Sequence, residues 1–556
     1  MSTDHLTALR RAMARPAFYP HPVDAVDCRE THISLVFLAG DYAYKIKKPV
    51  GLEFLDFRTL ERRREDCHAE VRLNARLAAD VYEGVFPVTR EDEGLMFNGT
   101  GEPVEYVVRM RRLPDDRAMP AMLARGRLDS NDLDRLAAVL AGFYPDTVVS
   151  DGVGGLETVR ENCAENFRQI RDFVPDRVSA ADLETLRRAT RLFLQRRERR
   201  ISERLAEGHV RECHGDLRGE HVYFLPEGIR IIDGIEFNRR MRFGDVASDI
   251  AFLLMDLEYQ GFSQAAEMLL VRFLGRYDDS GMLGLLDFFR CYRACVRLKV
   301  ACFQLAQMDS RRENRPAKTA SVDSSEREPD APKSGNAPAE TDRGTELEQR
   351  VSGYTALALR DAHRMVRPML YVVMGMIAAG KSTVATALGR ALDLDVLGSD
   401  RIRRELFGKP GGPPGEVPFG GDIYRPEATE RVYAEMIQRA QSRLVSGESV
   451  VLDASFRSAE RRDAARAMAE AAGVPVFFVE CDCPDSALRE RLRARDRGGE
   501  ALSDARLSHL AEFRKQYEPP DEIPEGRRFS ADTTRPVNPL VAEVYLASRG
   551  GGADSP

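Results

Sequence analysis

The stretch from Gly375 to Ser382 has the residue types and spacing of a phosphate-binding loop, because it matches G-x-x-x-x-G-K-[ST]. It follows the apolar run MLYVVM and opens a helical pattern that continues to about Leu392. The glycines let backbone N–H groups surround phosphate oxygens, Lys381 can reach the outer phosphates, and the Ser382 hydroxyl can ligate Mg²⁺. We therefore predict that ATP and Mg²⁺ are the cofactors. The predicted cofactor-binding residues are Gly375, Met376, Ile377, Ala378, Ala379, Gly380, Lys381, Ser382 and Thr383.

Asp400 and Arg403 form a D-x-x-R pattern directly after an apolar run at 394–398. A carboxylate at this place could deprotonate an acceptor hydroxyl, so we predict Asp400 to be catalytic. Arg403 would then orient the substrate. The alternative is that Asp400 caps the N-terminus of a helix, and both roles can hold at once.

Two further features are typical of a site that binds a metal ion and a phosphoryl group. Asp453 ends the apolar run at 450–452, where P-loop proteins place an acid that orients the metal, although a simple strand-end turn is the alternative. Arg491 and Arg495 share one face of a predicted helix and could close over the phosphoryl group. Because the chain is rich in arginine, a solvated helix surface explains that pair equally well.

A second set of candidate residues lies in the segment 213–221, CHGDLRGEH, which is followed by an apolar run at 229–232 and then Asp233. We predict Asp216 to accept the proton of an acceptor hydroxyl, and Asp233 to bind Mg²⁺. His221 occupies the position of a further metal ligand. Magnesium prefers oxygen ligands, so the His221 imidazole could instead bond Asp216 or a water. Asp245 and Asp249 are expected to cap a helix or brace a loop.

This second site requires a lysine on a strand and a glutamate on the following helix. Only nine of the 82 basic residues are lysines, and three of them lie within 45–48. We prefer Lys45, paired with Glu70, as cofactor-binding residues. Lys47 shares a strand face with Lys45, and Glu65 is the alternative to Glu70. No glycine-rich loop precedes the lysine strand, so any cover for the phosphates must come from 29–34.

The elements that must position these residues differ between the two halves. Residues 31–48 predict two strands around a Gly40-Asp41 turn, 59–78 predict an amphipathic helix, and mainly helices follow, with a hairpin at 221–233. In the C-terminal half, short apolar runs alternate with helical stretches, which indicates a parallel sheet with crossover helices. These runs are 370–374, 394–398, 449–452 and 475–480.

The domain limits follow from composition. Between 309 and 345 the only large apolar residue is Val322, so this insert is predicted to be disordered. We predict one domain from 1–308 plus 346–365, and a P-loop domain over 367–548.

The motif His214-Gly215-Asp216 and the later segment Gly244-Asp245-Val246-Ala247-Ser248-Asp249 resemble motifs of the aminoglycoside phosphotransferase and choline kinase branch of the protein-kinase-like fold. The segment 369–546 resembles small P-loop kinases such as zeta toxins, polynucleotide kinases and gluconate kinases. Together the halves resemble a bacterial fusion of an aminoglycoside phosphotransferase-like domain with a P-loop kinase. The resemblance implies an α+β protein-kinase-like domain followed by an α/β P-loop NTPase domain with a parallel sheet.

Charge and hydropathy restrict the partners. The net charge is −7 and the isoelectric point is near 5.9, which argues against a general nucleic-acid-binding surface. No window approaches a membrane span and the first residues lack an apolar signal region, so a cytoplasmic location is expected. Partners are expected to be ATP and a small-molecule acceptor, with the oligomeric state left open.

The leading functional hypothesis is an ATP-dependent phosphotransferase with two kinase sites that act on small-molecule hydroxyl groups. The alternative is a P-loop kinase or ATPase regulated by a catalytically weak or inactive kinase-like domain that binds a ligand. Phosphorylation of nucleic-acid ends is a third hypothesis, which the acidic balance of charges disfavours.

Overall fold

A computed structural model describes residues 3–52, 55–92, 94–313, 340–408, 422–496 and 506–550 of the chain. It divides into two compact units, which are considered separately. The first unit comprises Met1–Val159 and Arg199–Arg276, and the second comprises Arg160–Glu198 and Tyr277–Pro556. This division reflects which parts of the chain contact each other, and its limits differ from the domain limits expected from composition. Those domain limits remain a prediction.

The first unit is built on a six-stranded antiparallel sheet with the strand order β1-β2-β3-β8-β6-β7. The predicted hairpin at 31–48 is present, and Gly40 takes φ +56° at its turn. The strands are β1 (Val26–Glu30), β2 (Ser34–Ala39), β3 (Tyr42–Lys47), β6 (Tyr82–Glu91), β7 (Gly94–Phe97) and β8 (Glu102–Arg111). Leu9 and Met13 of helix α1 (Thr3–Met13) pack with buried residues of this sheet, such as Phe37 of β2.

Residues 82–111 correct one expectation, because they form strands where mainly helices were expected. Gly84, Pro87 and alternating charged residues obscure the period of two in β6, and the pairing of β8 with β3 and β6 comes from the tertiary fold.

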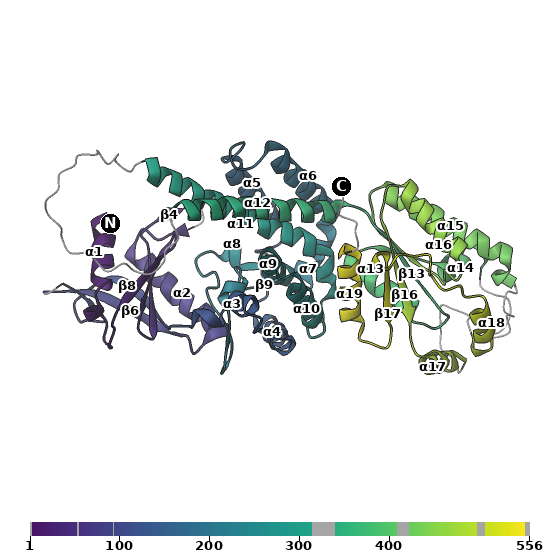
Figure 1. Cartoon of the computed structure of the whole chain (residues 1–556), viewed down its shortest axis with the longest axis horizontal. Coiled ribbons are helices and arrows are strands. Elements are labelled where there is room, and N and C mark those ends of the chain that lie inside the picture. The colour runs from purple at the N-terminus through teal and green to yellow at the C-terminus, as the bar shows by residue number, and fades with distance from the viewer. Residues whose placement is uncertain are drawn as a thin grey trace. The chain divides into compact units, whose positions relative to one another are not determined.

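Helix α2 (Leu60–Ala78) lies against β6 and β8 (Figure 1). Its first turn is capped by Thr59, whose side chain accepts from the backbone N–H of Arg62. Its buried face carries Cys67 and Ala78, which pack with Ala43 of β3 and other sheet residues. The same face carries Glu70, so the helix brings a carboxylate to the lysine strand.

The rest of the first unit is mainly helical, and its short strands frame the segment 213–221. The predicted hairpin at 221–233 is formed by β10 and β11. The elements are α3 (Met119–Ala124), α4 (Ser130–Phe143), α7 (Glu198–Ala206), β9 (Val210–Glu212), β10 (Val222–Leu225), β11 (Gly228–Ile231), α8 (Arg239–Arg242), β12 (Phe243–Asp245), α9 (Val246–Tyr259) and α10 (Ser263–Leu274), with a small β4 (Gly51–Leu52) and β5 (Leu55–Asp56) ribbon near the first sheet.

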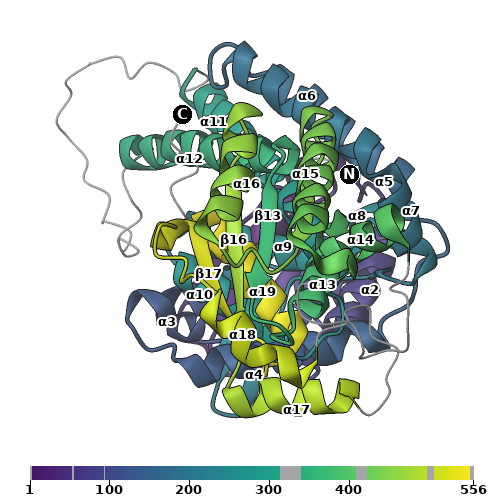
Figure 2. The same cartoon turned by 90° about the vertical axis from the view of Figure 1, so that its right-hand side faces the viewer.

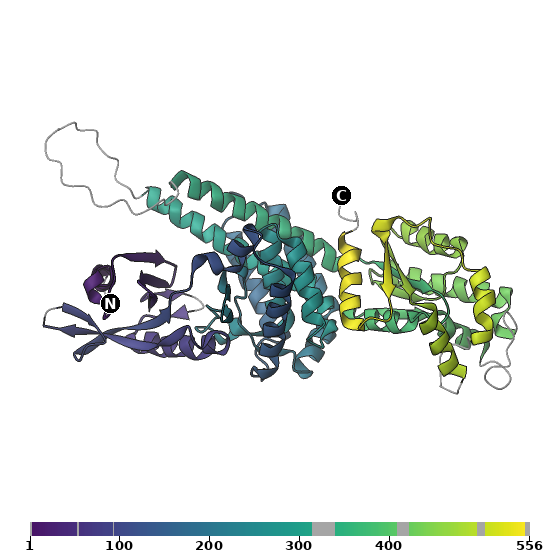
Figure 3. The same ribbon diagram turned by 60° about the horizontal axis from the view of Figure 1, so that its bottom comes forward.

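The second unit contains a helical part and a parallel sheet. The helices are α5 (Leu156–Arg171), most of which belongs here, α6 (Ala180–Arg196), α11 (Leu283–Glu313) and α12 (Glu340–Val366). Helices α11 and α12 run side by side (Figure 3). Both helices extend into the segment 309–345 that was expected to be disordered, since α11 ends at Glu313 and α12 begins at Glu340. Each end continues a helix that is packed along the rest of its length. The prediction for 314–339 lies outside the described residues.

Five parallel strands form the sheet in the order β14-β15-β13-β16-β17. They are β13 (Leu370–Gly375), β14 (Asp395–Gly398), β15 (Val450–Asp453), β16 (Val476–Asp482) and β17 (Arg528–Asp532). The first four are those predicted from the apolar runs. The sequence RFSAD of β17 is short and half polar, so it carries no such signal.

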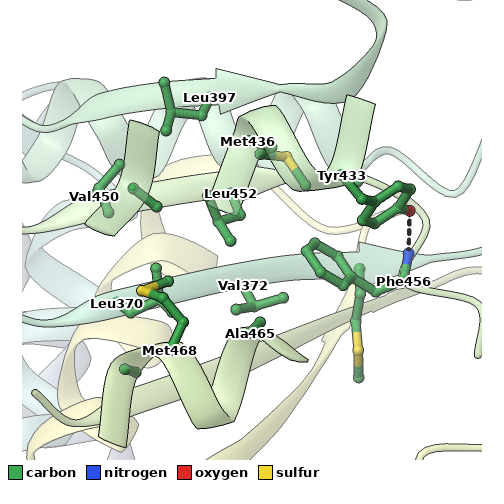
Figure 4. Packing of buried hydrophobic residues seen from close by; sticks show 14 of the residues in the cluster. Leu370, Val372, Leu397, Tyr433, Met436, Val450, Leu452, Phe456, Ala465 and Met468 are labelled. Carbon is green, nitrogen blue, oxygen red and sulfur yellow. Dashed lines mark hydrogen bonds between the residues drawn. The ribbon is translucent and has the colours of Figure 1, made fainter. Parts of the chain in front are cut away.

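Helices cover both faces of this sheet, as crossover connections require. Alternate residues of β13, Leu370 and Val372 among them, pack with α15 (Pro426–Val445) and α16 (Ala459–Ala471) (Figures 2 and 4). The Tyr433 hydroxyl accepts from the backbone N–H of Phe456 at 3.2 Å within this core. On the other face lie α13 (Lys381–Leu392) and α19 (Val537–Gly550). The remaining helices are α14 (Ser399–Phe407), α17 (Asp485–Asp496) and α18 (Leu510–Lys515).

The chain therefore combines an α+β protein-kinase-like fold with an α/β P-loop fold built on a parallel sheet, the fold class expected from the sequence.

Candidate active sites

In the first unit, Lys45 is held between two carboxylates. Its Nζ lies 2.8 Å from Glu70 Oε1 and 2.7 Å from Asp233 Oδ1. Burial opposes the charge of Lys45, but Asp233 and Glu70 raise its pKa well above the usual value. Lys45 in turn lowers the pKa of the Asp233 carboxyl far below its ordinary range. Lys45 of β3, Glu70 of α2 and Asp233 after β11 thus meet in one cluster of ion pairs.

The second lysine of β3 is also part of this cluster. Lys47 is completely buried and lies 2.6 Å from Glu70 and 2.9 Å from Asp66, and it contacts Glu236 as well. Glu70 is therefore shared by both lysines, while the alternative Glu65 is exposed. The sequence did not single out Glu236, whose pKa is raised to about 8 by burial.

Asp216 lies in the segment 213–221 and is engaged by a neighbouring cation. Arg218 donates to both of its carboxylate oxygens, at 3.0 and 2.8 Å, and this guanidinium is largely buried. Asp249 accepts from the backbone N–H groups of His214 and Gly215 at 2.7 and 2.9 Å, and Asp245 caps α9. These two acids have the bracing and capping places expected of them.

His221 is built into the same segment. Its Nδ1 lies 2.9 Å from the Asp216 carbonyl oxygen and its Nε2 lies 3.2 Å from Arg218 Nη2. Since a guanidinium only donates, Nε2 accepts and Nδ1 carries the proton. Burial and Arg218 lower the pKa of His221 to about 4, so the ring is neutral near pH 7. Nε2 also lies 3.7 Å from Asp233, but its lone pair faces Arg218, which does not favour the predicted metal-ligand role.

The P-loop of the second unit has the backbone that phosphate binding requires. Gly375 has φ +135° and Gly380 has φ +91°, and a Cβ on Gly375 would approach the Cys481 carbonyl oxygen to 2.4 Å. Lys381 Nζ donates to the Met376 carbonyl oxygen at 2.7 Å, so its side chain lies across the loop. Ser382 and Thr383 are exposed at the start of α13.

Asp453 lies at the end of β15, opposite Gly398 of β14 and Val373 of β13 in the strand register. Burial raises the pKa of this carboxyl, while a hydrogen bond from Ser382 and the charge of Lys381 oppose the rise. A hydroxyl paired with a carboxylate beside a lysine is an oxygen donor set that suits Mg²⁺. Among the described residues, no group of three or more His, Cys, Asp or Glu side chains could hold a metal ion by itself.

Asp400 lies in the first turn of α14 and Arg403 in the next turn, beside the ends of β14 and β15. Arg403 is buried, donates to the Ile423 carbonyl oxygen at 2.7 Å and stacks on the Tyr424 ring at 4.7 Å. Burial lowers the pKa of Arg403, while the nearby charge of Asp400 opposes that change. Arg403 thus holds Ile423 and Tyr424 in place, and its contact with a substrate remains a prediction.

Arg491 contacts the P-loop backbone. Its guanidinium donates to the Ala378 carbonyl oxygen at 3.2 Å and to the Thr533 carbonyl oxygen at 2.9 Å. Thr533 Oγ1 donates to the Ala379 carbonyl oxygen at 2.7 Å. Thr533 follows β17 and no sequence pattern marked it. The prediction for the Arg495 side chain lies outside what the structure describes.

In the part of the chain that the structure describes, no helix is both long and apolar enough to cross a membrane.

Parts of the chain are similar to known proteins. Residues 370–520 match the AAA domain family. A choline/ethanolamine kinase family protein from Mesorhizobium loti aligns with 64% of this chain and 99% of its own at 14% identity and a TM-score of 0.37. A gluconokinase from Sinorhizobium meliloti aligns with 34% of this chain and 94% of its own at 23% identity and a TM-score of 0.24.

Over its full length the chain also resembles proteins without an assigned function. An uncharacterized protein of Mycobacterium tuberculosis is 30% identical over 534 residues, which cover 94% of this chain and 96% of that protein. An uncharacterized protein of Mycobacterium bovis matches with the same identity and coverage. The chain therefore belongs to the same family as these mycobacterial proteins.

Proposed function

We propose that this protein is an ATP-dependent kinase with two phosphotransferase sites, each acting on a hydroxyl group of a small molecule. The observation that carries the proposal is the P-loop, where Lys381 crosses the loop and Ser382 pairs with Asp453 at the sheet edge. Phosphoryl transfer depends on positioning and on stabilising negative charge, which such a site supplies.

At the P-loop, the backbone N–H groups and Lys381 would bind phosphate oxygens, and Ser382 with Asp453 would hold Mg²⁺. When bound, Mg²⁺ would supply positive charge that offsets the negative charge of the phosphates. Lys381 now donates to a carbonyl oxygen of the loop, so its ammonium is already directed across the site and could turn to an incoming phosphate. Arg491, tied to Ala378 and Thr533, would keep the loop in its phosphate-binding shape.

Asp400 would accept the proton of the acceptor hydroxyl in this domain. It follows β14, next to the strand that carries Asp453, so an acceptor bound there would face the phosphate site. The Arg403 charge lies close enough to interact with the Asp400 carboxylate.

In the first unit, Lys45 would position phosphates and Asp233 would bind Mg²⁺, with Glu70 fixing the lysine. Asp216 would accept the proton of the acceptor. The Asp233 side chain is 47% exposed, which leaves it accessible to a ligand.

A specific observation favours the regulatory alternative for this unit. Arg218 donates to both carboxylate oxygens of Asp216, so a proton transferred to Asp216 would have to enter next to a cation that already holds this carboxylate. If this contact prevents the transfer, the first unit would bind a nucleotide or ligand without turnover and would regulate the P-loop domain.

The two hypotheses can be separated with ATP radiolabelled on its terminal phosphate and a metabolite extract. The Lys381→Ala variant removes the P-loop activity. Labelled product that persists in this variant and disappears when Asp216→Ala is added would support two enzymes. No product from Lys381→Ala, with product from Asp216→Ala, would support regulation, and no product from the unaltered chain would argue against both.

A further inference from the structure

The segment that carries Asp216 holds a buried cation beside the acids of the kinase-like site. Arg218 donates to both carboxylate oxygens of Asp216, at 3.0 and 2.8 Å, and its Nη1 donates to Glu220. Arg218 is only 8% exposed, so the protein encloses its guanidinium. A planar guanidinium that holds a carboxylate with two parallel bonds has a fixed position and orientation.

The charge of Arg218 acts on further acids of the same unit. Burial opposes this charge, but Asp216 and, without a direct bond, Asp256 and Asp233 raise the pKa of Arg218 above its ordinary value. Asp256 of α9 also holds the segment itself, because it accepts from the backbone N–H of Gly219 at 2.9 Å. One guanidinium therefore offsets negative charge on both acids that were predicted to act in transfer, Asp216 and Asp233.

His221 connects this cation to Asp233. Its Nε2 lies 3.2 Å from Arg218 Nη2 and 3.7 Å from Asp233 Oδ2. Its Nδ1 donates to the Asp216 carbonyl oxygen at 2.9 Å, which fixes the orientation of the ring. Because Nε2 accepts from the guanidinium, its single lone pair is used and does not also bind a metal ion.

The residues at the two places for metal ligands differ in their fit to Mg²⁺. In protein kinases, an aspartate after a strand and an asparagine five positions after the catalytic aspartate hold two Mg²⁺ ions. Asp233 fits one Mg²⁺, because it offers carboxylate oxygens and its side chain is 47% exposed. His221 stands at the place of the asparagine, offers no oxygen and has its lone pair directed to Arg218.

We propose that Arg218 takes the place of a second metal ion, so that the kinase-like site binds its nucleotide with a single Mg²⁺, held by Asp233. This inference rests on the proposed function, because it requires the first unit to bind a nucleotide. A guanidinium supplies positive charge beside Asp216 without the octahedral shell of oxygen ligands that another Mg²⁺ would need. His221 is a positioning residue in this arrangement, since its Nε2 holds the Nη2 of Arg218 beside Asp216.

The test counts the Mn²⁺ ions that bind with a nonhydrolysable ATP analogue to the full chain carrying Lys381→Ala and Asp453→Asn, which remove the P-loop contribution. Mn²⁺ takes the same oxygen ligands as Mg²⁺, and electron paramagnetic resonance distinguishes free from bound Mn²⁺. One bound Mn²⁺ per bound analogue is expected. Two bound Mn²⁺ ions per analogue would overturn the inference and leave the proposed function standing, whereas no bound analogue would overturn both.

Variants of the same chain show whether Arg218 keeps a second ion out. Arg218→Met combined with His221→Asn removes the guanidinium and supplies an amide oxygen, so two Mn²⁺ ions per analogue are expected. His221→Asn alone should still bind one, because Arg218 remains. Arg239→Met is the matched control and should also bind one, since Arg239 lies in the same unit but pairs with Asp151.

A single Mn²⁺ in the chain with Arg218→Met and His221→Asn would overturn the inference, as would a second Mn²⁺ in the Arg239→Met control. Circular dichroism checks that each variant is folded. If the chain without Arg218 does not fold, the count in the chain that retains Arg218 and His221 decides alone, because it requires no change in the kinase-like site.

Discussion

The shared carboxylate of Glu70 allows a sharp test of the kinase-like site. Glu70 is 1% exposed and contacts Lys45 at 2.8 Å and Lys47 at 2.6 Å. Replacing it by glutamine keeps the shape and removes the charge that both ammonium groups require. Removing one partner from a buried ion pair costs about 3–5 kcal/mol. Lys45 retains Asp233 and Lys47 retains Asp66, so we expect the lower end, about 3 kcal/mol.

Hydrogen–deuterium exchange of peptides from β3 and α2, followed as urea is added, reports the unfolding free energy of this region alone. Glu65→Gln is the matched control on the same helix, because Glu65 is exposed and should change this free energy by no more than ~0.5 kcal/mol. A loss below ~1 kcal/mol for Glu70→Gln, or the same loss as the control, would refute the reasoning.

The remaining predictions concern pH, the P-loop backbone and its supports. The pKa of His221 is about 4 in the folded chain and about 6.5 in the unfolded chain, so the unfolded chain binds more protons between these two pH values. The free energy of unfolding should therefore fall by up to ~3 kcal/mol as the pH drops from 6.5 to 4. Hydrogen exchange against pH measures this, and His221→Asn should flatten the dependence while leaving any ATP turnover of the first unit in place; an unchanged slope would contradict the assignment. Gly375→Ala should abolish ATP binding in the second unit, since its Cβ would lie 2.4 Å from the Cys481 carbonyl oxygen, whereas Gly473→Ala, with nothing within 4 Å, should cost only about 1 kcal/mol in thermal melting and leave binding intact. Thr533→Val should weaken ATP binding by about tenfold through loss of the bond to Ala379, measured by calorimetry, and wild-type affinity would show that this bond does not support the loop.

Local patterns predicted the residues that lie close to a strand or helix signal. Strand alternation placed Lys45 and Lys47 on one face, and Lys45 with Glu70 was preferred because a kinase-like site needs a lysine on a strand and a glutamate on the next helix. The structure places Lys45 Nζ 2.8 Å from Glu70 because α2 packs on the sheet that contains β3. The four strands of the parallel sheet that were predicted are short apolar runs, which a doubly covered sheet requires.

Contacts set by distant parts of the chain could not be predicted. Glu236 reaches Lys47 only because the chain turns after Asp233, which has φ +63°, and Thr533 reaches the P-loop only because β17 pairs with β16. The strands at 82–111 likewise owe their conformation to pairing in the sheet, where β8 pairs with β3 and β6 pairs with β8. Arg403 was predicted to orient a substrate, but its buried side chain contacts Ile423 and Tyr424, which lie 20 and 21 positions further along the chain.

The central claim, two ATP sites in one chain, is tested most directly by the stoichiometry of binding of a nonhydrolysable ATP analogue in equilibrium dialysis with Mg²⁺. The unaltered chain should bind two molecules, Lys381→Ala and Lys45→Ala should each bind one, and the double variant should bind none. A single site in the unaltered chain that is unaffected by Lys45→Ala would contradict the account.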